Sequence, residues 1–162
     1  MSKLVRDAMT VNPRTVNLND SVVDAAHIME QEDVGSVPVV DTDNILVGMI
    51  TDRDITLRVV AAGKDPRSTA AGEVATTQVS PAYPDESLDE ALEQMAHRQV
   101  RRLPVIEDDR VVGILAQADV AQEVKDKKAG QVLEAISQPA IEPDLRRRPP
   151  VPNGPIIDGG PG

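Results

Sequence analysis

The sequence predicts a mixed α/β fold, of the α+β kind, built from one strand–helix–strand–strand–helix unit used twice. Two observations carry this prediction. Residues 21–55 recur as residues 87–120, and in both copies a helical hydrophobic period gives way to two short strand-like runs and then a strand-to-helix corner. One unit of about 60 residues would barely hold a hydrophobic core alone, so the pair is the predicted folding unit.

Each copy begins with an amphipathic helix, predicted over "SVVDAAHIMEQED" (21–33) and "SLDEALEQMAHRQ" (87–99). Apolar side chains recur at the i, i+3, i+4, i+7 spacing that marks one face of a helix. A serine three residues before an acidic residue predicts a capping box at Ser21 and again at Ser87. The apolar positions are Val22, Ala25, Ala26 and Met29, and then Leu88, Ala91, Leu92 and Met95.

Two strands joined by an acidic turn follow each helix. The turn "DTDN" (41–44) starts like a calcium loop, but Leu46 stands where that loop requires glycine, so we expect a hairpin turn instead. A second helix is expected after each corner. The predicted strands are "VPVV" (37–40), "ILVGMI" (45–50), "LPVI" (103–106) and "VVGIL" (111–115).

Composition sets the boundaries of the expected domains. The stretch 63–72 is small and polar, typical of a linker, and 138–162 is so rich in proline and glycine that we expect disorder. The expected organisation is repeat 1 over 1–62, the linker 63–72, repeat 2 over 73–126, a short helical extension over 127–137 and the tail 138–162.

Charge and residue usage exclude several classes of function. A net charge of −10 disfavours binding to nucleic acid or to an anionic membrane surface. The chain has no cysteine, so a disulfide framework and a thiolate metal site are excluded, and no stretch approaches the ~18 apolar residues of a membrane helix. We expect a cytoplasmic protein without bound metal.

A helix, an h-P-V-h strand, an acidic turn and a G-h-h-T-x-x-D corner, all repeated in register over residues 4–126, resemble a tandem pair of cystathionine β-synthase (CBS) domains. The layout, with "MITDRDI" and "HRQVRRLPVI", is similar to small stand-alone two-CBS proteins of actinobacteria, the hypoxic-response type included. The resemblance implies a disc-like module with two pseudo-symmetric clefts, which bind adenine nucleotides in many members. It also implies a homodimer.

The resemblance further implies which residues hold a ligand. Asp54 would bind the ribose diol and Thr51 a phosphate, while the second corner keeps Asp119 but has Ala116 in place of the hydroxyl. Thr-x-x-Asp is also an ordinary helix cap, and its spacing alone leaves both interpretations open. The other implied contacts are phosphate-binding Arg101 and Arg102, and an adenine slot near Thr15, Val16, Val37, Pro38, Ala82, Tyr83, Leu103 and Pro104.

These features favour a regulatory module that senses an adenosyl ligand such as AMP, ADP, ATP or S-adenosylmethionine, requires no cofactor and acts in trans on a partner protein. No Gly-rich phosphate loop, nucleophile elbow or paired catalytic carboxylate is present, so an enzyme is not expected. The alternative is a ligand-independent dimeric scaffold with vestigial clefts. A metal-dependent enzyme is the least favoured class, and it would use Asp41, Asp43, Asp52 or Asp54.

Overall fold

The computed structural model describes residues 3–123. The last residues of repeat 2 (124–126), the expected helical extension 127–137 and the expected disordered tail 138–162 lie outside the described residues. Within residues 3–123, no helix is long and apolar enough to cross a membrane.

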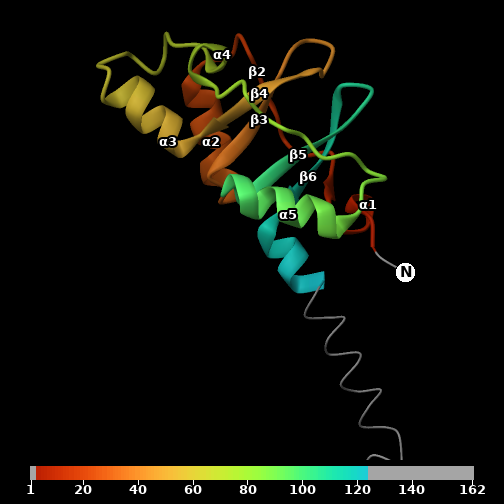
Figure 1. Cartoon of the computed structure of the whole chain (residues 1–162). Coiled ribbons are helices and arrows are strands. Elements are labelled where there is room, and N and C mark those ends of the chain that lie inside the picture. Colours follow the sequence, from red (N-terminus) through yellow and green to blue (C-terminus); the bar gives the residue numbers. More distant parts are fainter. Residues whose placement is uncertain (1–2, 124–162) are drawn as a thin grey trace, which may run out of the picture. The chain divides into compact units, whose positions relative to one another are not determined.

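The first half of the described chain carries four helical segments and four strands (Figure 1). In order these are α1 (Val5–Ala8), β1 (Thr10–Val11), β2 (Val16–Asn17), α2 (Val22–Glu32), β3 (Ser36–Val40), β4 (Leu46–Thr51), α3 (Asp52–Ile55) and the π-helical turn η1 (Thr56–Val60). The second half has α4 (Ala71–Val74), α5 (Leu88–Arg98), β5 (Arg102–Glu107) and β6 (Arg110–Ala116), and residues 117–123 are again helical.

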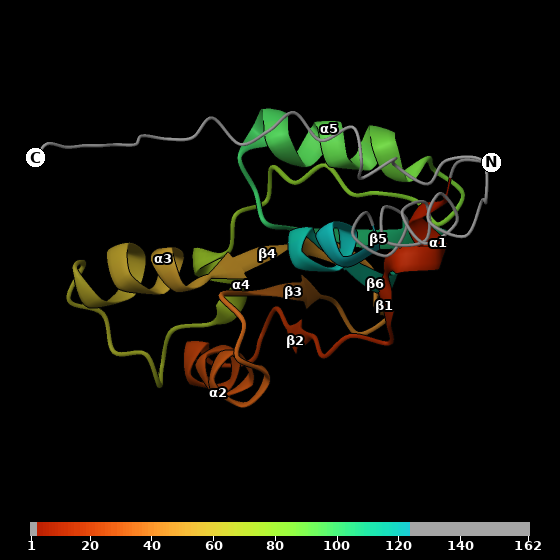
Figure 2. The same ribbon diagram turned by 90° about the horizontal axis from the view of Figure 1, so that it is seen from below.

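The strands form two three-stranded sheets, in the orders β2-β3-β4 and β1-β6-β5. Each contains one of the predicted antiparallel hairpins, β3–β4 or β5–β6. Helices α2 and α5 lie on opposite sides of the strands (Figure 2). The prediction of a mixed fold made of two similar repeats is confirmed.

The two long helices bury the faces that anchor each repeat. Val22 and Ala25 are buried in α2, as predicted, and so are Leu88, Ala91 and Met95 in α5. The third buried residue of α2 is Ile28 rather than the predicted Met29, and Ala26 and Met29 are half-buried. The buried face of α2 is therefore rotated slightly from the apolar face that the spacing predicted.

The predicted capping boxes at Ser21 and Ser87 are wrong. Both serines are the N-cap residues, but neither hydroxyl makes a capping hydrogen bond. The first free N–H group of each helix instead donates to a backbone carbonyl far away in sequence, Val22 to Thr69 and Leu88 to Lys3, both at 2.9 Å. Each helix start is thus held by a carbonyl of another segment, and in α2 the Asp24 N–H donates to the Ser21 backbone carbonyl rather than to its hydroxyl.

The two segments that supply these carbonyls pack reciprocally. The segment before β2 packs against the second repeat, and the segment around α4 packs against the first. Strand β1 pairs with β6 of the second sheet, and Val5 of α1 belongs to the second hydrophobic core. Conversely, Thr76 pairs with Met49 of the first sheet, and α4 belongs to the first core. The expected linker 63–72 thus contains the start of α4, and its residues Thr69 and Ala71 are buried.

The hairpin turns of the two sheets also meet. Leu46 N–H donates to the Asp109 carbonyl at 3.0 Å, and Val111 N–H donates to the Asn44 carbonyl at 3.1 Å. The segment 41–44 is a hairpin turn, as predicted. One Asp41 carboxylate oxygen accepts hydrogen bonds from the N–H groups of Asp43 and Ile45. Together with the reciprocal segments, these bonds tie the repeats into one folding unit.

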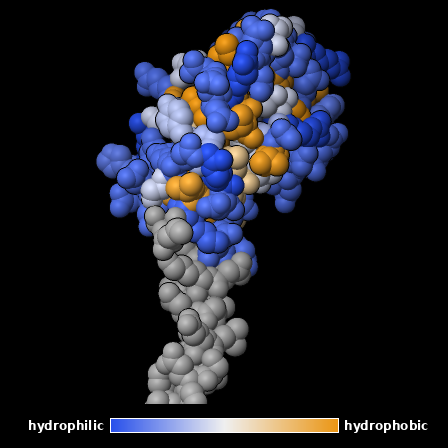
Figure 3. All heavy atoms as spheres, turned by 90° about the vertical axis from the view of Figure 1, so that its right-hand side faces the viewer, coloured by the Kyte–Doolittle hydropathy of each residue, from blue (hydrophilic) through white to orange (hydrophobic). Residues whose placement is uncertain are grey.

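The face of the molecule on the right-hand side of Figure 1 is mainly hydrophilic (Figure 3). In Figure 3, hydrophobic residues are scattered in small patches among hydrophilic ones. The described surface also carries a few strongly exposed apolar side chains, which are Val11, Leu57, Val60, Tyr83 and Val100.

Candidate functional site

A cleft of about 1300 Å³, called here the central cleft, lies between the repeats. Its walls are the C-terminal ends of α2 and α5, the first residues of β3 and β5, the segment 78–80 and the two strand-to-helix corners. The corner residues in the wall are Thr51, Asp52 and Arg53 from the first repeat and Ala116, Gln117 and Ala118 from the second.

Positive charge gathers in the central cleft although the chain is strongly acidic. Arg98, Arg101 and Arg102 enter the wall from the second repeat, and Arg53 enters from the first corner. In the part of the chain that the structure describes, none of the four forms an ion pair with an acidic side chain. Unpaired guanidinium groups around a cleft suit an anionic ligand, especially one with phosphate oxygens.

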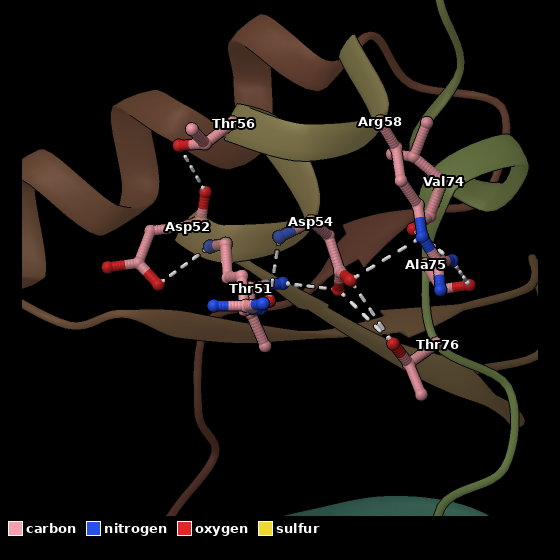
Figure 4. A network of polar contacts seen from close by, with 9 residues as sticks. Thr51, Asp52, Asp54, Thr56, Arg58, Val74, Ala75 and Thr76 are labelled. Carbon is pink, nitrogen blue, oxygen red and sulfur yellow. Dashed lines mark hydrogen bonds and ion pairs between the residues drawn. The ribbon is translucent and has the colours of Figure 1, made fainter. Parts of the chain in front are cut away.

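The first corner is closed by a reciprocal capping box (Figure 4). The Thr51 hydroxyl accepts from the Asp54 N–H at 3.0 Å, and the Asp54 carboxylate accepts from the Thr51 N–H at 3.0 Å. Asp54 is buried, with 8% of its surface exposed. The helix-cap interpretation of Thr-x-x-Asp therefore describes this corner.

Two further side chains contact the Asp54 carboxylate. The Thr76 hydroxyl lies 3.3 Å from each carboxylate oxygen, and Arg58 Nε lies 3.8 Å from Oδ1. Arg58 Nη1 also donates to the carbonyls of Val74 at 3.0 Å and Ala75 at 3.4 Å. Asp54 is thus the centre of a polar network that joins α3 to the segment leading into the second repeat (Figure 4).

The second corner lacks that network. Ala116 is buried and has no hydroxyl to offer, and the half-buried Asp119 side chain makes no hydrogen bond within residues 3–123. Glu123 follows Asp119 at the spacing with which Arg58 follows Asp54, and it pairs with Lys3 at 2.6 Å. The same positions of the repeat hold opposite charges, so the two corners differ electrostatically.

The structure brings only some of the expected ligand contacts to one place. Thr51, Arg101, Arg102 and Leu103 line the central cleft. A smaller cleft of about 180 Å³ is lined by Val37, Pro38 and again Arg102. The expected residues that line neither cleft are Asp54, Thr15, Val16, Ala82, Tyr83, Pro104 and Asp119.

The reciprocal packing explains this difference. Val16 and Ala82 are fully buried in the two hydrophobic cores, and Tyr83 lies on the surface with 52% of its area exposed. The first corner shares the central cleft with the segment 78–80 of the other repeat as well as with strand residues of its own repeat. The sequence "QVS" has no period or charge that would have indicated this position.

The glycine that begins each corner motif has a packing role that the sequence did not indicate. A Cβ on Gly48 would lie 2.4 Å from the Thr76 carbonyl oxygen, and that oxygen accepts a hydrogen bond from Met49. Only glycine therefore lets the segment from the second repeat approach β4 this closely.

The acidic residues considered for a metal-dependent enzyme act locally. Asp41 organises its hairpin turn, Asp52 accepts from the Arg53 N–H at 2.9 Å, and Asp54 belongs to the capping box. Over residues 3–123, no group of three or more histidine or acidic side chains is arranged to hold a metal ion.

Two strand–helix–hairpin–helix repeats that exchange their first segments around a shared cleft define a tandem domain pair. The chain matches the CBS domain family twice, over residues 5–61 and 71–126, and it belongs to that family.

Two curated relatives have the same extent. The chain is 41% identical to the CBS domain-containing protein YhcV of Bacillus subtilis, over 85% of this chain and 97% of the relative. It is 37% identical to Hypoxic response protein 1 of Mycobacterium tuberculosis, over 83% and 94%. The expected likeness to small two-CBS proteins of the hypoxic-response type is confirmed.

Solved structures of CBS pairs have the same fold. The CBS domain pair of protein MJ0100, in complex with 5′-methylthioadenosine and S-adenosyl-L-methionine, has a TM-score of 0.69 at 31% identity, over 78% of this chain and 99% of that one. CBSX2 in complex with AMP has a TM-score of 0.67 at 26% identity, over 77% and 98%. Both neighbours bind ligands that contain an adenosyl group.

Proposed function

We propose that this protein is a regulatory module that binds a phosphorylated adenosine ligand reversibly in the central cleft and catalyses no reaction. The observation that carries the proposal is the group of four arginines in the cleft wall, none paired with an acid among residues 3–123. The AMP and S-adenosyl-L-methionine complexes of similar CBS pairs support the adenosyl part. The ligand's effect would pass in trans to a partner protein, and a cytoplasmic location stays an expectation.

The charge of the cleft favours AMP, ADP or ATP over S-adenosylmethionine. Each added phosphate brings negative charge and oxygens that guanidinium groups bind in a bidentate manner. The sulfonium centre of S-adenosylmethionine is positive and would meet Arg98, Arg101 and Arg102 on the same wall. We expect affinity to increase with the number of phosphates.

Thermal unfolding and calorimetry with AMP, ADP, ATP and S-adenosylmethionine test the proposal, since a ligand that binds only the folded state raises the unfolding midpoint. The variant Arg101→Ala/Arg102→Ala should bind ATP at least about tenfold more weakly, because it removes two charge-assisted contacts. Arg67→Ala changes an exposed arginine outside both clefts and serves as the control. If none of the four compounds shifts the midpoint, the proposed function is wrong.

One observation favours the alternative, a ligand-independent scaffold. The carboxylate of Asp54 already accepts hydrogen bonds from Thr51 and Thr76, so the first corner is satisfied without a ligand. A scaffold would keep its partner bound whether or not nucleotide is present. Comparing partner capture from cell extract with and without ATP separates the two functions.

The proposal includes a homodimer. Leu57 and Val60 are three residues apart in the helical segment that follows the first corner, and 48% and 69% of their surfaces are exposed. Both exposed apolar side chains project from this one turn, and a second copy of the chain would cover them. Light scattering at tens of micromolar should give the dimer mass, and Leu57→Glu should convert it to the monomer mass. A monomer mass for the unmodified chain would exclude the dimer.

A further inference from the structure

Thr76 stands between the central cleft and the Asp54 carboxylate. Thr51 and Thr76 line the cleft, while Asp54, which is hydrogen-bonded to both, does not. We infer that the Thr76 hydroxyl occupies the position of a ligand hydroxyl on Asp54, and that a bound ribose must displace it. Thr76 then sets the affinity of the cleft. This inference rests on the proposed function, because it assumes a ligand with a ribose diol.

The contacts of the carboxylate show what a ligand would gain. The Thr76 hydroxyl lies at 3.3 Å from both Oδ1 and Oδ2, longer than usual for a hydrogen bond between oxygens. A hydroxyl has a single proton, so it cannot donate fully to two acceptors at once. A ribose diol has two protons and can give each carboxylate oxygen its own donor. When a ribose displaces Thr76, the one hydrogen bond that Thr76 shares between the two Asp54 oxygens is replaced by two separate hydrogen bonds from the ribose.

The displacement needs no movement of the backbone. Thr76 exchanges two backbone hydrogen bonds with Met49, at 2.8 and 2.9 Å, and these hold its main chain against β4. Rotation about χ1 of Thr76 moves the hydroxyl away from Asp54 while both backbone bonds stay in place. The capping bond from Thr51 N–H and the neighbouring Arg58 guanidinium keep the carboxylate in position throughout.

The test is calorimetry with ATP on three purified full-length variants. Thr76→Val keeps the shape and the β-branch but removes the competing hydroxyl, and should bind ATP about tenfold more tightly than the unmodified protein. Thr76→Ser keeps the hydroxyl, and its affinity should stay close to that of the unmodified protein. Thr77→Val makes the same chemical change one residue on, outside both clefts, and should leave affinity unchanged.

A second ligand shows whether the effect passes through the ribose. 2′,3′-Dideoxy-ATP has no diol to place on Asp54, so Thr76→Val and the unmodified protein should bind it equally. Weaker ATP binding by Thr76→Val would mean that the hydroxyl contacts the ligand directly, and would overturn the inference. An equal gain for ATP and the dideoxy compound would overturn it too. If the unmodified protein binds ATP and Thr76→Val binds it equally well, the inference alone fails; if neither binds any nucleotide, the proposed function fails with it.

Discussion

The two strand-to-helix corners occupy equivalent positions in the repeats but are held together differently. At the first, Asp54 accepts from Thr51 and Thr76 and lies beside Arg58. At the second, the Asp119 carboxylate has no hydrogen-bond partner among the described residues, and Ala116 offers no hydroxyl. The same carboxylate is a structural centre in one repeat and a half-buried, unengaged group in the other. A shared motif therefore does not imply a shared role within one chain.

The largest difference in stability between the two corners is expected when the glycine that precedes each corner is replaced. In Gly48→Ala the new Cβ would meet the Thr76 backbone oxygen at 2.4 Å, whereas in Gly113→Ala it would meet the flexible Met9 side chain at 2.7 Å and the Thr10 carbonyl at 3.0 Å. We expect Gly48→Ala to lower the free energy of unfolding by about 3 kcal/mol and Gly113→Ala by about 1 kcal/mol. Urea unfolding measures both, and equal losses would contradict the comparison.

The second-largest difference is expected when the aspartate of each corner is replaced by alanine. Asp54→Ala removes a cap and a hydrogen bond to a charged acceptor, so we expect a loss of about 2–3 kcal/mol in the free energy of unfolding. Asp119→Ala removes no described hydrogen bond and should cost under about 0.5 kcal/mol. In calorimetry we expect one tight nucleotide per chain, abolished by Asp54→Ala, with Asp119→Ala affecting only weak binding. Two equal sites per chain would refute the assignment.

A smaller effect is expected from completing the second corner. Ala116→Thr places a hydroxyl three residues before Asp119, as Thr51 does before Asp54. If the hydroxyl caps the helix, the free energy of unfolding should rise by about 1 kcal/mol, and any nucleotide bound at this corner should bind more tightly. Chemical unfolding and calorimetry of the same sample measure the two effects. A destabilised variant would show that the buried position of Ala116 has no room for the larger side chain.

The smallest effect is expected from removing residues 138–162, which lie outside the described part of the chain. If both corners are properties of residues 3–123 alone, the truncated protein should keep its unfolding midpoint and its nucleotide affinity. Differential scanning fluorimetry with and without ATP tests both the unfolding midpoint and the binding of nucleotide. A fall of several degrees would show that the tail contributes to the stability of the domain pair.

Local periodicity accounts for what the sequence could predict. Helices α2 and α5 and both hairpins have apolar positions spaced widely enough to show a period, and their bounds differ from the predicted ones by a residue or two. Helices α1 and α4 have four residues each, too few for a helical period. Arg101 and Arg102 were assigned to the site by resemblance, and both line the central cleft.

What could not be predicted depends on which segments pack together. The sequence shows that two repeats exist, but not that each gives its first segment to the other. The adenine slot was expected near Val16 and Ala82, which are buried in the two cores, whereas the central cleft is lined by other residues of both repeats. Likewise, Thr76 acquires its contact with Asp54 only through this long-range pairing. Pairing between distant segments has no local pattern that could reveal it.

The pairing of β1 with β6 has a consequence for how the protein is made. Thr10 leaves the ribosome before its partner Ile114, which follows only after most of both repeats has been translated. At about 5–20 residues per second, β1 waits on the order of ten seconds for that partner. The first core, by contrast, is complete once α4 has emerged. The β5–β6 hairpin must then fold onto a strand that was synthesised well before it.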